Sequence, residues 1–161
     1  MKGLGVALAI AIGIWVAGAL QQVVAPRMAL FGASPDFLLI SLAAGSLFLK
    51  RNQAGMLGFV CGLIHGALAG ANLTHYVISR TIGGFLAAWS RTRTLEPNAA
   101  LAIGTGFFLT LVSQVLFMFL SPPKSGLAAY LGATIITAAY NGVLVLPVYL
   151  ALKWLRGASR A

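Results

Sequence analysis

Long, uninterrupted runs of apolar residues dominate the chain, and short polar or charged stretches separate them. The runs cover residues 3–24, 35–49, 55–71, 73–89, 99–120 and 127–154. Strands of a membrane barrel alternate in polarity over about ten residues, whereas these runs are longer and unbroken, which is typical of helices. The pattern therefore predicts an all-α fold with six helices in one domain over residues 1–161.

Composition changes this picture from a helical protein to a helical membrane protein. Hydrophobic residues make up 60% of the chain and charged residues only 8%, whereas about a quarter of the residues are charged in an ordinary soluble domain. A chain of this kind would expose large apolar patches to water. Lipid removes that conflict, and the six runs are then six transmembrane helices, whose backbone groups are satisfied within each helix.

The distribution of positive charge predicts how the helices are oriented. The chain has 11 Lys and Arg residues and a net charge of +9, with Asp36 and Glu96 as its acids. If both termini are cytoplasmic, the inner side carries Lys2, Lys50, Arg51, Arg91, Arg93, Lys153, Arg156 and Arg160, and the outer side carries Arg27 and Lys124. This is the bias of the positive-inside rule. The charge is thus explained by membrane lipid, and no nucleic-acid partner is expected.

A five-span arrangement is the alternative to this topology. In it, the run at residues 73–89 lies on the membrane surface, and Arg91 and Arg93 fall outside. That placement breaks the positive-inside bias, so six spans with both termini inside are favoured.

Four glycines form the clearest motif. Gly58, Gly62, Gly66 and Gly70 are spaced four residues apart, which places them on one face of a helix. A stripe without side chains lets another backbone approach closely. We expect it to pack against a helix of the same chain rather than to form a face for a separate partner.

Two prolines mark expected features of the helices. The triplet Ser34-Pro35-Asp36 resembles a helix start, with Ser34 as N-cap, Pro35 at the first position and Asp36 in the first turn. Pro147 lies inside the last run, where it removes a backbone hydrogen bond and is expected to kink the helix.

Asp36, His65 and Arg80 are ionisable residues at or within the apolar runs. Counted from the cations at the inner ends of their runs, all three lie roughly 16–21 Å from the inner surface. We therefore expect an intramembrane polar cluster in which Asp36 pairs with Arg80. Such residues often mark functional sites, but a pair that only stabilises the fold is the slightly favoured alternative.

The sequence offers no set of residues suited to catalysis. It lacks a GxGxxG, Walker, CxxC or HExxH motif, and its acids are Asp36 and Glu96. We expect no enzymatic activity, no cofactor and no metal site.

Five segments of the chain resemble the bacterial rod shape-determining protein MreD family. They are SPDFLLI from Ser34, LKRNQAG from Leu49, GFVCGLIHGALAG from Gly58, HYVISRTIGGFLAAW from His75 and AAYNGVLVLPVYLALKWL from Ala138. The Pro-Asp pair followed by the glycine-rich helix is the most specific element. At His65 the family pattern has an acid, so no acidic role is transferred to that residue.

The resemblance implies a non-enzymatic subunit of the cell-elongation complex (elongasome), which controls cell shape through cell-wall peptidoglycan synthesis. It implies a multi-pass protein of the bacterial inner (plasma) membrane that binds the single-span scaffold MreC and sets its conformation. The glycosyltransferase RodA, its transpeptidase and MreB would be indirect partners.

A second candidate function belongs to a different class. Substrate-binding S components of energy-coupling-factor vitamin transporters are also small six-span proteins and resemble the MreD family in layout. Such a protein needs an outward-facing polar pocket, for which the sequence offers chiefly Asp36, His65, His75 and Arg80. Copurification with a single-span scaffold, or with an ATPase module and a vitamin, would discriminate between the two functions.

Overall fold

The computed structural model describes residues 2–30, 33–89, 97–123 and 126–158, and this part of the chain is helical, without a β-strand. The helices are α1 (Lys2–Val23), α2 (Phe37–Ser46), α3 (Arg51–Ala69), α4 (Leu73–Ala87), α5 (Ala99–Leu120) and α6 (Leu127–Ala158), and a short 3₁₀ helix, η1 (Ala25–Met28), follows α1. The predicted all-α fold with six α-helices is confirmed.

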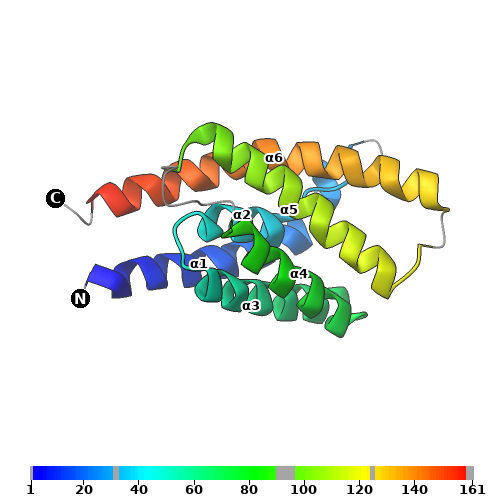
Figure 1. Ribbon diagram of the computed structural model, residues 1–161, viewed down its shortest axis with the longest axis horizontal. Coiled ribbons are helices and arrows are strands. Elements are labelled where there is room, and N and C mark those ends of the chain that lie inside the picture. The colour runs from blue at the N-terminus through cyan, green and yellow to red at the C-terminus, as the bar shows by residue number, and fades with distance from the viewer. Residues whose placement is uncertain (1, 31–32, 90–96, 124–125, 159–161) are drawn as a thin grey trace.

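Consecutive helices run in alternating directions along the long axis of the molecule (Figure 1). The beginning of α1, the connection between α2 and α3, and the end of α6 lie at one end, which we call the terminal end. The α1–α2, α3–α4 and α5–α6 connections lie at the opposite end. The most extensive helix contact joins α3 to α4, followed by that between α5 and α6.

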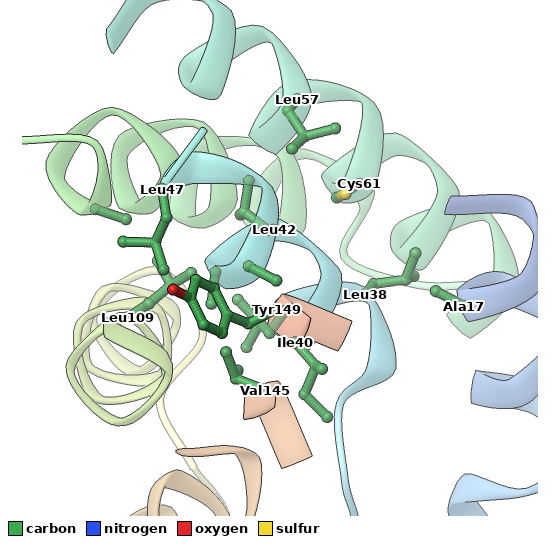
Figure 2. Close-up of a cluster of buried hydrophobic side chains, with 14 of the residues drawn as sticks. Ala17, Leu38, Ile40, Leu42, Leu47, Leu57, Cys61, Leu109, Val145 and Tyr149 are labelled. Atoms are coloured by element: carbon green, nitrogen blue, oxygen red, sulfur yellow. The ribbon is translucent and has the colours of Figure 1, made fainter. Parts of the chain in front are cut away.

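Helix α2 is the centre of the bundle. It has 10 residues, which makes it about 15 Å long, and it is shorter than the predicted run at residues 35–49. Because it is apolar on every side, it is buried on every side; Leu38 and Leu42 have no exposed surface. Figure 2 shows the side chains around it: Ala17 from α1, Leu57 and Cys61 from α3, Leu109 from α5, and Val145 and Tyr149 from α6.

The predicted start of α2 is wrong by two residues. Asp36, not Ser34, is the N-cap, and its carboxylate accepts a hydrogen bond of 3.0 Å from the backbone N–H of Leu39. Pro35 therefore precedes the helix and is buried, while Ser34 is exposed. Asp caps helices as well as Ser does, and capping at Asp36 also leaves its second carboxylate oxygen available for an ion pair.

The glycine stripe packs inside the chain, against α4. A Cβ atom on Gly62 would lie 2.6 Å from Cα of Val77, and one on Gly66 would lie 2.7 Å from Cα of Leu73. Gly70 does not extend the stripe as predicted. It ends α3 in the left-handed conformation, with φ of +65°, and a Cβ there would meet no atom within 4 Å.

In the described residue ranges, two helices are long and apolar enough to cross a membrane by length and composition. They are α5 and the stretch Leu127–Gly157 of α6. Helix α6 runs unbroken through Pro147 and ends beyond the predicted residue 154. The kink at Pro147 stays a prediction.

The molecular surface carries many large apolar side chains. The exposed fraction is 80% for Trp15, 75% for Phe119 and 71% for Trp154, and Met56 and Phe108 are also largely exposed. Soluble monomers rarely present extended apolar surface of this kind, so the surface is better suited to lipid than to water.

Candidate functional site

A buried ion pair joins the start of α2 to the middle of α4. The guanidinium Nη2 of Arg80 donates a hydrogen bond to the carboxylate Oδ2 of Asp36. Both side chains are almost fully buried. The predicted contact between these two residues is therefore present in the structure, and each charge has its counter-charge inside the protein.

His65, from α3, completes the polar cluster. Its ring Nδ1 lies 2.9 Å from Nη2 of Arg80 and 3.5 Å from Oδ1 of Asp36. A guanidinium group only donates hydrogen bonds and a carboxylate only accepts them. Nδ1 therefore accepts from Arg80 in one tautomer and donates to Asp36 in the other.

The ring of Tyr76, from α4, contacts both the imidazole of His65 and the guanidinium group of Arg80. The ring stacks on the imidazole of His65, with centroids 4.3 Å apart. The guanidinium carbon of Arg80 lies 4.7 Å from the centre of the same ring, within cation–π range. Tyr76 therefore orients both side chains that approach Asp36.

The backbone at the start of α2 is held by side chains from two other helices. The N–H of Asp36 donates to Oδ1 of Asn141 (2.9 Å), and the N–H of Phe37 donates to Oε1 of Gln21 (2.8 Å). The amide of Asn141 in turn donates to Oγ1 of Thr110 at 3.1 Å. These bonds satisfy N–H groups at a helix start that would otherwise be buried without a partner.

The glycine stripe contributes to the site by setting the distance between α3 and α4. A Cβ on Gly58 would overlap the backbone carbonyl of Arg80. The absence of that atom lets the two helices approach so closely that His65 and Arg80 touch.

A polar recess lies beside the ion pair. Its volume is about 250 Å³. It is lined by Gln21, Ala33, Ser34, Pro35, Asp36, His65, Gln114, Tyr130, Ala133, Thr134 and Thr137. A smaller cavity of about 80 Å³ shares Asp36 and Gln114 with it, and is also lined by Leu39, Tyr76, Arg80, Ser113 and Phe117.

Two buried polar atoms lie at the smaller cavity without a hydrogen-bond partner among the described residues. They are Nε of Arg80 and Oγ of Ser113. Buried polar side chains are nearly always hydrogen-bonded. The arrangement is therefore suited to receive hydrogen-bonding atoms from water or from a small molecule.

The sequence predicted that Asp36, His65 and Arg80 lie together, but it did not predict the residues that hold them in place, Tyr76 and Asn141. His75 lies edge-on to Phe117, with ring centroids 6.0 Å apart, and lines neither cavity. Within the described parts of the chain, no group of three or more His, Cys, Asp or Glu side chains is placed to hold a metal ion.

Comparison of the chain with protein-family models, with curated proteins and with solved structures gives no match.

Proposed function

We propose that this chain is a non-enzymatic membrane subunit that binds the transmembrane helix of a single-span scaffold. The resemblance to the MreD family gives the proposed setting, which is the cell-elongation complex of the bacterial inner membrane with an MreC-like scaffold as the partner. The observation that carries the proposal is the distribution of polarity. Large apolar side chains cover the surface, while the buried charges of Asp36 and Arg80 are paired within the bundle.

The proposed topology has six spans and both termini in the cytoplasm. It is supported by cations at the terminal end that contact aromatic rings, as at a membrane interface. The guanidinium of Arg51 lies 4.6 Å from the ring centre of Trp89, and that of Arg156 lies 5.6 Å from the ring centre of Phe48. Four other residues that entered the predicted bias, Arg91, Arg93, Lys124 and Arg160, lie outside the described residues, and so does the side chain of Lys2.

Helix α2 is too short to cross the roughly 30 Å hydrocarbon core by itself. This is compatible with the six-span proposal because the helix and the residues directly before it are covered by protein. Non-helical backbone at membrane depth is tolerated where protein covers it; Ala33, Pro35 and Asp36 are buried, whereas Pro26, Ala29 and Leu30, farther from α2, are exposed.

In the proposed function the Asp36–Arg80 pair is a structural pin. It ties α2 to α4 and thereby fixes the shape of the surface that a partner helix would contact. A general acid or base must be free to exchange protons with a substrate, whereas the carboxylate of Asp36 is occupied by Arg80 and by the N–H of Leu39.

The second candidate, an S component of a vitamin transporter, is favoured by one observation, the polar recess. Purification of the tagged full chain in mild detergent, followed by mass spectrometry of copurifying proteins, distinguishes the two. We expect a single-span scaffold, and a tagged unrelated six-span protein from the same membranes is the control. Recovery of an ATPase module and no scaffold would contradict the proposal and favour the S component.

A further inference from the structure

The polar recess beside the ion pair, called the chamber from here on, is unusual in a chain with few polar residues. Five parts of the fold contribute to it: α1, the segment before α2, α3, α5 and α6. Ser34 at its edge is exposed, whereas Thr134 and Thr137 on its wall are buried. The chamber thus extends from the surface toward the ion pair.

The wall offers both hydrogen-bond donors and acceptors. The hydroxyl of Tyr130 donates to Gln114, whose carbonyl O lies at 2.9 Å and whose side-chain Oε1 lies at 3.0 Å. The amide nitrogen of Gln114 is a donor, and the hydroxyls of Thr134 and Thr137 both donate and accept. Oγ of Ser113 and Nε of Arg80, in the adjoining cavity, are buried and have no hydrogen-bond partner among the residues that the structure describes.

The charge of the chamber is balanced. Asp36 and Arg80 neutralise each other. The other described lining residues carry no carboxylate, ammonium or guanidinium group. A buried ion without a counter-charge is strongly disfavoured, so the chamber discriminates against anions and cations.

The volume sets the size of the occupant. An apolar cavity of about 150 Å³ holds a benzene-sized molecule, so about 250 Å³ corresponds to a molecule of roughly ten non-hydrogen atoms. We propose that this chamber binds a small uncharged molecule that both donates and accepts hydrogen bonds. This site does not depend on the scaffold partner, and its failure would leave the copurification result unchanged.

The test uses the full chain in detergent with three probes of one size and different charge. Nicotinamide is neutral, nicotinate is an anion and 1-methylnicotinamide, methylated on the ring nitrogen, is a cation; myo-inositol serves as a second neutral probe. Because a ligand that binds only the folded state stabilises it, nicotinamide or myo-inositol should raise the melting temperature by at least about 2 °C at millimolar concentration. The two charged probes should give a smaller shift.

Variants locate the binding. Ala133→Phe fills the chamber and should abolish the shift, whereas Ala139→Phe, the same change at an exposed position of α6, should keep it. Thr137→Val preserves the shape of the wall, removes one hydroxyl and should reduce affinity several-fold even if Ala133→Phe fails to fold. The proposal is overturned if neither neutral probe stabilises the protein or if a charged probe stabilises it most. It is also overturned if Thr137→Val and, where it folds, Ala133→Phe retain the full shift.

Discussion

Asp36 and Arg80 depend on each other because each compensates the charge that the other brings into the protein interior. Asp36 has a second role as the N-cap of α2, and the two roles use different carboxylate oxygens. A sequence pattern predicts a cap from the order of residue types alone. The choice between Ser34 and Asp36 was instead decided by tertiary partners, namely Arg80 on the side chain and Asn141 on the backbone.

This dependence predicts a non-additive response to mutation. Asp36→Asn keeps a good N-cap, so its effect reports mainly the lost charge, and Arg80→Gln removes the opposite charge. Each single change should destabilise the fold by about 3–5 kcal/mol, because it leaves one buried charge unpaired. The double variant should regain part of that loss in thermal unfolding in detergent.

Arg27→Gln, which removes an exposed cation in η1, is the control and should change the melting temperature little. If the loss in the double variant equals the sum of the single losses, Asp36 and Arg80 are not energetically coupled.

At the scale of elements, the α3–α4 hairpin was the part of the fold most accessible from sequence. The spacing of Gly58, Gly62 and Gly66 indicated a close helix contact, and only a short turn separates α3 from α4. Moving from Gly62 to Gly66 along α3 moves the contact from Val77 back to Leu73 along α4. This antiparallel register brings His65 to Tyr76, a pairing that could have been derived once the turn at Gly70 was recognised.

The length of α2 was harder to predict because the sequence does not change from apolar to charged residues where the helix ends. The apolar run continues through Leu47, Phe48 and Leu49, and Leu47 is fully buried although it lies outside the helix. The helix ends where the chain must turn to begin α3 at Arg51. That turn is set by packing between helices, which a one-dimensional pattern does not contain.

The space around each glycine predicts opposite effects for the same substitution at Gly62 in the hairpin and at Gly104 outside it. Gly62→Ala places a Cβ within 2.7 Å of the Tyr76 carbonyl oxygen, so α3 and α4 must separate, at a cost of about 1–3 kcal/mol. Gly104→Ala, in α5, meets no atom within 4 Å and should stabilise its helix by about 0.5–1 kcal/mol. Thermal unfolding of both variants in one detergent gives the comparison.

Gly62→Leu and Gly66→Leu should lower stability further than Gly62→Ala, since a larger side chain must fit the same contact. Equal melting temperatures for Gly62→Ala, Gly104→Ala and the unmodified chain would show that the contact at Gly62 tolerates a methyl group.

At the scale of the whole molecule, the sequence predicted the number and order of the helices but not which helix lies at the centre. The runs that form α2 and α5 are similarly apolar, so hydropathy does not separate a lipid-facing helix from a protein-covered one. The structure makes that distinction: α2 is buried, whereas α1, α5 and α6 each carry exposed large apolar side chains. The distinction depends on which helices surround α2, and those contacts join residues far apart in the sequence.

The six-span and five-span arrangements make different predictions for the second half of the chain. In both, Asn52 at the start of α3 is cytoplasmic and Arg27 is outside. With six spans Pro122 is outside and Gly157 is cytoplasmic, and with five spans these two positions exchange sides. Introducing single cysteines at these four exposed positions in a Cys61→Ala background therefore separates the alternatives, since Cys61 is the native cysteine and is buried.

The measurement is labelling of spheroplasts with a membrane-impermeant maleimide, before and after permeabilisation. We expect Arg27→Cys and Pro122→Cys to react in intact spheroplasts, and Asn52→Cys and Gly157→Cys to react only after permeabilisation. The reason is the concentration of Lys50, Arg51 and the last cations of α6 at the terminal end, which the positive-inside rule places in the cytoplasm. Reaction of Gly157→Cys in intact spheroplasts, with Pro122→Cys protected, would instead establish five spans. Reaction of Asn52→Cys from outside would reverse the whole orientation.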